Sequence, residues 1–153
     1  MNTFMIVQTL IYIDDEYVDI ESADCLISTH DDDRYGKFRI LANNRVIEIE
    51  DSILIFWYLF LRKLKYLELN SEIVVSAWDN NETLLIKYNK SRQFVIIEQI
   101  GKTSLKVSRD AFISSILTAG QSVIRSIARI SPDFQNADSI ENELFQAFGI
   151  NKQ

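Results

Sequence analysis

The residues whose types and spacing come closest to a reactive cluster are four consecutive ones, His30, Asp31, Asp32 and Asp33. Imidazole and carboxylate groups can bind a divalent cation or transfer protons. Consecutive side chains point in diverging directions, however, whereas calcium loops space their oxygen ligands at alternate positions around a glycine. A carboxylate beside a histidine also favours the protonated imidazole, which is a poor proton acceptor at pH 7. The run therefore predicts a solvated acidic loop without a metal ion or a catalytic base.

Other patterns that carry catalytic chemistry do not occur in the sequence. A histidine-dependent nucleophile needs a base beside a serine or cysteine, and His30 is the only histidine. The single Cys25 excludes an internal disulfide and a four-cysteine zinc site, and it fits a buried strand thiol. Phosphate-binding loops and HExxH helices are missing. We therefore predict a protein that is not an enzyme and takes no cofactor. A hydrolase whose carboxylates converge only in the folded chain is the alternative.

Charge is distributed unevenly along the chain. No lysine or arginine precedes Arg34, and the remaining 120 residues carry 13 acidic and 16 basic side chains. The formal charge of −6 is thus −9 before Arg34 and +3 after it. A field of one sign steers association and selects positively charged partners. The nine carboxylates at the front belong to Asp14, Asp15, Glu16, Asp19, Glu21, Asp24, Asp31, Asp32 and Asp33.

Nucleic-acid binding requires a basic face, which this chain lacks apart from one cluster. We expect the cations of that cluster to pair with acids of the same chain or to solvate a helix, so that no nucleic acid is bound. They are Lys102, Lys106, Arg109, Arg125 and Arg129.

Length and composition predict a single globular domain over residues 1–153. Hydrophobic residues make up 47% of the chain and charged residues 25%, as in an ordinary globular protein. Four glycines and one proline indicate short loops and no flexible linker. The first residues lack a positive n-region, and the longest apolar run, residues 53–61, is too short to cross a bilayer. We therefore expect a cytoplasmic protein without membrane contact.

The pattern in the first half of the chain predicts strands followed by a helix. Strands are predicted over residues 4–13, where Asp14, Asp15 and Glu16 break the pattern, and over residues 23–28. A hairpin is predicted over residues 38–49, because paired asparagines, which tolerate positive φ, separate two alternating segments. Residues 51–65 follow as a helix that is apolar nearly all round, with Asp51 or Ser52 as its N-cap.

The second half predicts an antiparallel meander and two further helices. Strands are expected over residues 72–78, 83–88 and 93–100, joined by short polar turns, with a short edge strand at 103–107. Apolar residues at helical spacing then predict helices over 108–130 and 138–148. The expected fold class is α+β, a mostly antiparallel sheet of about six strands with helices packed on it. An exposed edge of the meander could pair two copies into a homodimer.

Two aromatic residues could anchor a protein partner. Trp78 lies at a strand end beside Asp79, where core burial is favoured and a partly exposed indole is the alternative. Tyr35 directly follows the acidic run and Arg34.

The order of elements resembles that of small immunity proteins from bacterial polymorphic-toxin and contact-dependent-inhibition systems. The resemblance is carried by the strand ending in an acidic turn, residues 11–20, and by the later hairpin, aromatic helix, meander and closing helix. It covers most of the chain, is architectural, and carries over no binding residue. It implies a non-enzymatic protein that binds a cognate toxin and blocks its active site, and many such toxins are cationic nucleases.

The expected binding surface is acidic, because an acidic patch that faces a basic cleft mimics the phosphate backbone and speeds encounter. An acidic adaptor or anti-defence protein of phage or plasmid type would use the same physics and is an alternative. The residues expected to contact the partner are Asp14, Asp15, Glu16, Asp31, Asp32, Asp33, Tyr35, Trp78 and Asp79.

Overall fold

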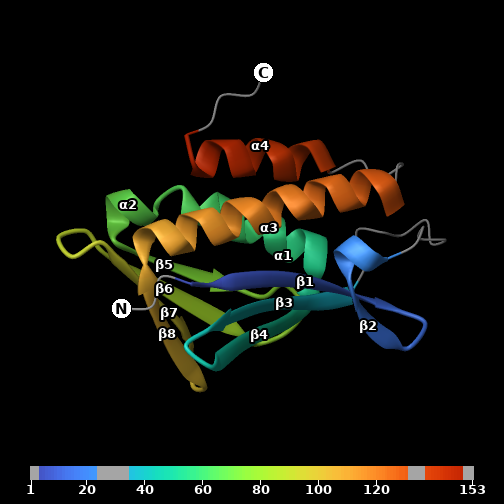
Figure 1. Ribbon diagram of the computed structural model, residues 1–153, viewed down its shortest axis with the longest axis horizontal. Helices are drawn as coiled ribbons and strands as arrows, with labels where there is room; N and C mark the ends of the chain where they lie inside the picture. Colours follow the sequence, from blue (N-terminus) through green and yellow to red (C-terminus); the bar gives the residue numbers. More distant parts are fainter. Residues whose placement is uncertain (1–3, 24–34, 131–136, 150–153) are drawn as a thin grey trace.

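The computed structural model describes residues 4–23, 35–130 and 137–149. They form two four-stranded antiparallel sheets with helices on one side (Figure 1). The predicted α+β class is confirmed, although eight strands in two sheets replace the single sheet of about six strands. The strand expected at residues 23–28 falls almost wholly outside the described residues, as does the acidic run at residues 30–33.

The first sheet, sheet A, has the strand order β2-β1-β3-β4. Two-residue turns close both of its hairpins, with positive φ at Asp14 (51°) and Asp15 (66°) and at Asn43 (56°) and Asn44 (61°). Such turns match the right-handed twist of the strands they join. The acidic turn therefore leads directly into a strand, β2, that the sequence pattern did not predict. The strands are β1 Ile6–Ile13, β2 Glu16–Asp19, β3 Tyr35–Ala42 and β4 Arg45–Ser52.

The second sheet, sheet B, is the predicted meander, with the order β5-β6-β7-β8. Alternation along each strand puts one row of aliphatic side chains inward, including Ile73, Ile86 and Ile97. The expected edge strand near residue 103 is present as β8. The strands are β5 Glu72–Ser76, β6 Thr83–Asn89, β7 Phe94–Gln99 and β8 Thr103–Ser108.

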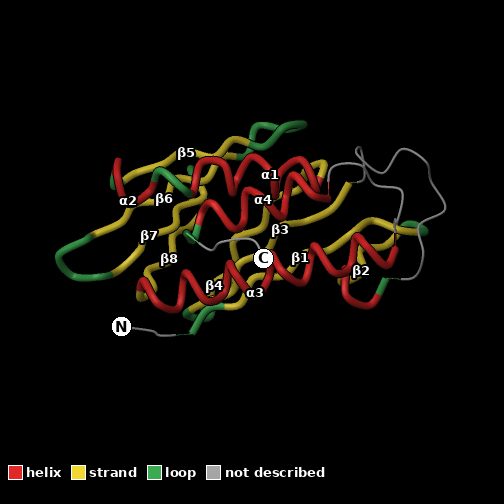
Figure 2. The backbone as a smooth tube through the Cα atoms, turned by 90° about the horizontal axis from the view of Figure 1, so that it is seen from above, coloured by secondary structure: helices red, strands yellow, loops and turns green. Residues whose placement is uncertain are grey.

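Helices cover the inner side of the sheets in two layers. Figures 1 and 2 show α1 and α3 lying over the strands, with α4 outermost and between them. α4 can sit close because Gly120 in α3 has no side chain: a Cβ there would lie 2.8 Å from Cδ1 of Leu144. The helical elements are η1 Ile20–Ser22, α1 Ile53–Leu64, α2 Leu67–Asn70, α3 Arg109–Ile130 and α4 Ala137–Ala147. The short α2 was not predicted.

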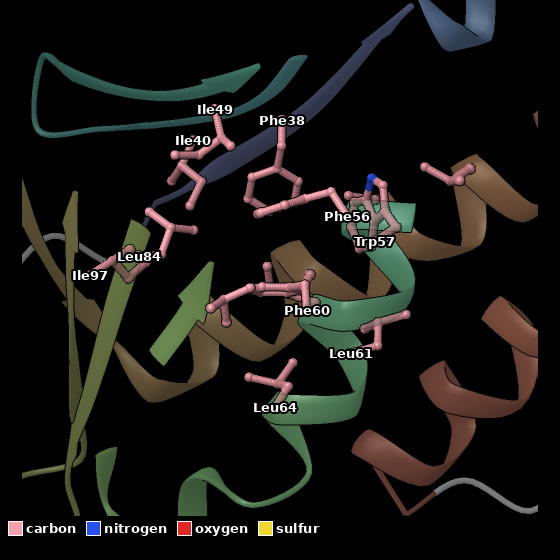
Figure 3. Packing of buried hydrophobic residues seen from close by; sticks show 14 of the residues in the cluster. Phe38, Ile40, Ile49, Phe56, Trp57, Phe60, Leu61, Leu64, Leu84 and Ile97 are labelled. Carbon is pink, nitrogen blue, oxygen red and sulfur yellow. The ribbon is translucent and has the colours of Figure 1, made fainter. Parts of the chain in front are cut away.

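The core is built around α1, as its all-round apolar sequence predicts. Phe56, Trp57 and Phe60 are completely buried and gather around Phe38 of β3, with ring centroids 5.0–5.2 Å from the Phe38 ring (Figure 3). The indole N–H of Trp57 has a hydrogen-bond partner in this core, because Nε1 donates to Oγ1 of Thr9 at 2.9 Å. This packing fixes sheet A relative to α1.

α3 is the one described helix that is long and apolar enough to cross a membrane by length and composition. Its apolar residues Ile116, Val123 and Ile127 are buried against the rest of the fold. The same residues on the same face were predicted from helical spacing, which is the pattern of a core helix.

Candidate protein-binding face

The turn between β5 and β6 is held by a buried carboxylate. Asp51, at the end of β4, is fully buried, and its two carboxylate oxygens accept the backbone N–H groups of Trp78 at 2.6 Å and Asp79 at 2.7 Å. Hydrogen bonds to a charged acceptor are about twice as strong as neutral ones. Asp51 or Ser52 was predicted as a helix N-cap, and Asp51 does not take this role. The N-cap position of α1 is instead Ser52, which makes no side-chain capping bond.

Further hydrogen bonds fix the same turn to sheet A. Ser52 donates its hydroxyl to Asp79, and Asn80 donates its amide to the Glu50 carbonyl. Within the turn, the Asn80 side chain accepts the N–H of Glu82 at 2.8 Å. A turn with this many partners is pre-organised, so little conformational entropy is lost when it binds a partner.

The fixed turn presents an exposed indole. Trp78 has 64% of its surface exposed, so the sequence-based preference for core burial was wrong. Its neighbour Asp79 is exposed as well. Burial of a tryptophan ring is favourable, so an exposed ring can gain free energy by binding a partner. Tryptophan is one of the residue types that supply most of the binding energy in protein interfaces.

Three tyrosines continue from this turn across the outer face of sheet A. Tyr17 pairs with Tyr12, and the β1–β3 register, continued by one residue, puts Tyr12 beside Tyr35. Tyr35 pairs in turn with Ser52, whose hydroxyl binds Asp79. Neighbouring strands lie about 4.8 Å apart, so the row from Tyr17 to Ser52 spans roughly 14 Å. The Tyr12 and Tyr17 ring centroids are 5.0 Å apart, which shows that the row is in contact there.

A ladder of ion pairs borders the tyrosine row. Lys37 lies 3.0 Å from Glu48 and 3.6 Å from Glu50, and its Nζ sits 4.2 Å from the centroid of the Tyr17 ring. The hydrogen bond to Glu48 raises the pKa of Lys37. Burial raises the pKa of the Tyr17 hydroxyl, and the nearby Glu50 adds to that effect. The tyrosine faces therefore already hold one cation within the fold, by the attraction of an ammonium for an aromatic ring.

The front carboxylates that the structure describes form no ion pair with a described lysine or arginine. Among residues 4–23, 35–130 and 137–149, no lysine or arginine forms an ion pair with the carboxylates of this segment. Asp14, Asp15 and Glu16 are exposed at the tip of the β1–β2 hairpin. Asp19 accepts the N–H of Glu21 within η1 at 2.9 Å, and Glu21 accepts the Ser122 hydroxyl at 2.6 Å. The tip therefore keeps its negative charge facing solvent.

The surface that joins these features is called the acidic-aromatic face. It consists of Tyr12, Asp14, Asp15, Glu16, Tyr17, Tyr35, Glu50, Trp78 and Asp79. Six of the nine predicted contact residues belong to it, and the other three, Asp31, Asp32 and Asp33, lie outside the described residues. Sequence reasoning missed Glu50, and it also missed Tyr12 and Tyr17. Their alternation on either side of the acidic turn was the available signal, because a two-residue hairpin puts flanking residues on one face.

The basic residues behave mostly as expected. Lys102 pairs with Glu82 at 2.6 Å, and Arg109 pairs with Glu68 at 2.6 Å, which raises the pKa of Arg109. Arg129 donates to the backbone carbonyls of η1 and Ala23. These three cations are used within the fold.

Three concave sites among the described residues contain few carboxylates. A pocket of about 450 Å³ between β1 and α3 includes Asp19 and Glu21, and one of about 560 Å³ beside α2 includes Glu68. A third, of about 790 Å³ at the β3–β4 turn, includes none. A general acid needs a raised pKa, whereas hydrogen bonds from Lys102 and Gln99 lower that of Glu82. In Glu48, burial acts to raise the pKa, and the bonds from Lys37 and Arg39 outweigh it.

No group of three or more histidine, cysteine or acidic side chains that could hold a metal ion occurs among the described residues. No protein-family model, curated protein or solved structure is significantly similar to this chain.

Proposed function

We propose that this chain is a non-enzymatic immunity protein that neutralises a positively charged toxin domain by binding it through the acidic-aromatic face. The observation that carries the proposal is the exposed Trp78, held on a turn anchored by Asp51 and followed directly by the exposed Asp79. Interfaces are enriched in tyrosine and tryptophan, and a few rigid aromatic residues supply most of the binding energy.

The charge of the same face supplies the second part of the argument. Exposed carboxylates at the β1–β2 tip and at Asp79 create a negative field over the aromatic rings. Such a field raises association rates with cationic proteins, up to about 10⁸–10⁹ M⁻¹s⁻¹ at low salt. It also fits the cleft of a nuclease, which has to be positive to hold phosphates. A cytoplasmic site of action would follow, since the toxin would act there.

An acidic adaptor would use the same surface, so the partner decides between the two roles. The experiment is to express the chain together with the protein encoded by the adjacent gene in a host that the latter kills. Survival of the host, and a complex that co-purifies, support immunity. If the protein encoded by the adjacent gene is harmless when expressed alone, the immunity role is contradicted.

Binding to the same neighbouring protein is then measured by biolayer interferometry between about 50 and 500 mM NaCl, where screening lengths fall from about 14 to 4 Å. The proposal requires an association rate that falls steeply with salt, while dissociation changes less. An affinity that is insensitive to salt would contradict an acidic contact surface.

A further inference from the structure

The edges of the two sheets differ in how they are protected. Unpaired backbone groups on an edge strand attract further strands, and proteins cover such edges with charges, side chains or other elements. The edges of β4 and β8 face each other, and side chains bond to their backbone carbonyls. On the β8 side, Arg45 donates to the Ser104 carbonyl at 2.9 Å and Asn43 donates to the Lys106 carbonyl at 3.1 Å. On the β4 side, Gln99 donates to the Glu48 carbonyl at 2.9 Å.

The remaining edges of sheet A are protected as well. β2 is only four residues long and lies beside the carboxylates of the hairpin tip, whose like charges would oppose a second copy. β2 pairs only with the second half of β1. The edge of the first half is covered by α3, where the Ser115 hydroxyl donates to the Met5 carbonyl at 2.6 Å.

The edge of β5 has no such protection within the described residues. Bonds from Tyr88 N–H to the Ser71 carbonyl and from Ala77 N–H to the Glu82 carbonyl show that odd-numbered residues bond to β6. The N–H and C=O groups of Glu72, Val74 and Ser76 therefore point outward. No hydrogen bond from elsewhere in the described chain reaches them, and Figure 2 shows β5 along the margin of the molecule with no element beyond it.

This edge is complementary to itself. If two copies of β5 pair antiparallel about a two-fold axis at Val74, Val74 faces Val74 of the other copy and Glu72 faces Ser76. Each of these pairs exchanges two backbone hydrogen bonds, so all outward groups are satisfied and no like charges meet. Val74 is 45% exposed and Leu69, just before β5, is 81% exposed.

We infer that the chain forms a symmetric homodimer through β5, joining two copies of sheet B into one continuous eight-stranded sheet. The strand is only five residues long, so the interface is small and the dimer depends on concentration. The inference stands on the edge of β5 and does not depend on the identity of the toxin partner.

The test is sedimentation velocity of the full chain from low micromolar to about 1 mM, the range in which a weak dimer would form. The wild type is expected to shift from monomer to dimer. Val74→Lys should keep it monomeric across the range, because two lysines would face each other at the axis. Val74→Pro should do the same, since it removes only an outward N–H.

Val46→Lys is the matched control, because Val46 is a 47% exposed strand valine on sheet A. It should dimerise like the wild type. Circular dichroism and thermal melting confirm that each variant is folded, and if Val74→Pro fails this check, Val74→Lys alone decides. A wild type that stays monomeric at about 1 mM, or a Val74→Lys variant that still dimerises, would overturn the inference.

Discussion

The molecule has two exposed acidic turns that are built in opposite ways. The β1–β2 turn is closed by two residues, Asp14 and Asp15, in the left-handed conformation, and its side chains make few contacts. The β5–β6 turn is longer and is held by the fully buried Asp51 and by bonds from Ser52 and Asn80. The first turn presents charge, and the second presents an indole.

This difference separates two requirements of fast, tight binding. Charges act over about a Debye length and need no fixed geometry, so a sparsely bonded tip can carry them. An aromatic anchor has to meet its pocket in one orientation, and each mobile side chain costs about 0.5–1.5 kcal/mol to immobilise on binding. The hydrogen bonds to Asp51 fix the backbone from which the Trp78 indole projects.

The largest expected effect comes from removing the anchor of the second turn. Asp51→Ala leaves the N–H groups of Trp78 and Asp79 without their acceptors in a buried place. Hydrogen bonds to charged groups contribute about 1.5–3 kcal/mol each, so the free energy of unfolding should fall by about 3 kcal/mol in urea titrations.

Two variants control for this result. Asp51→Asn keeps one acceptor oxygen and should lose clearly less stability than Asp51→Ala. Asp14→Ala removes a carboxylate from the sparsely bonded turn and should change stability by no more than about 0.5 kcal/mol. Equal losses in Asp51→Ala and Asp14→Ala would show that the two turns are not built differently.

The next effect concerns the indole itself. Trp78→Ala should leave the free energy of unfolding nearly unchanged, because the ring is mostly exposed in the free protein. Affinity for the toxin partner should fall by about 30-fold, the loss of about 2 kcal/mol typical of an interface hot spot. Tyr66→Ala is the control, since Tyr66 is a 46% exposed aromatic residue outside the acidic-aromatic face. Equal affinities of both variants would remove Trp78 from the interface.

A smaller effect is expected at the hairpin tip. Replacing Asp14 and Asp15 by Asn and Glu16 by Gln should slow association with the same partner several-fold at low salt and flatten its salt dependence. Dissociation should change little. Asp110→Asn and Asp138→Asn, which are exposed on α3 and α4, serve as controls. Rates that respond equally to both sets would mean that overall charge, rather than the tip, steers the encounter. The same reasoning predicts slower association for Asn at Asp31, Asp32 and Asp33.

The elements that sequence could predict are those with local signals. The Asn43-Asn44 hairpin, the meander and α1 each carry their pattern within a dozen residues, and all three are present. β2 was missed because it has only four residues directly after an acidic turn, which was predicted to end the first strand. The division into two sheets depends on the contacts between β4 and sheet B, which join residues more than 50 positions apart in the chain.

The candidate site shows the same limit. The charge of Asp14, Asp15 and Glu16 could be read directly, because exposed acids need no partner to be recognised. The exposure of Trp78 depends on Asp51, which lies 27 residues earlier in the chain. Local reasoning considered Asp51, with Ser52 as the alternative, as the N-cap of the next helix instead. A rigid exposed aromatic residue is therefore visible only once the long-range hydrogen bonds are known.

The smallest expected effect is a dependence of stability on pH at the anchored turn. Hydrogen bonds from Lys102 at 2.6 Å and Gln99 at 2.9 Å lower the pKa of Glu82 in the folded protein. A carboxyl with a lowered folded-state pKa stabilises the fold fully above its unfolded-state value, about 4.3 for Glu, and loses this contribution as pH falls through the folded-state value. Glu82→Gln should therefore be less stable than the wild type at pH 7, by under about 1 kcal/mol because the pair is partly solvated. The difference should shrink as urea titrations are carried from pH 5 toward pH 3. If it instead stays constant across this range, the bonds to Glu82 do not depend on its charge, and the second turn is held by Asp51 without its help.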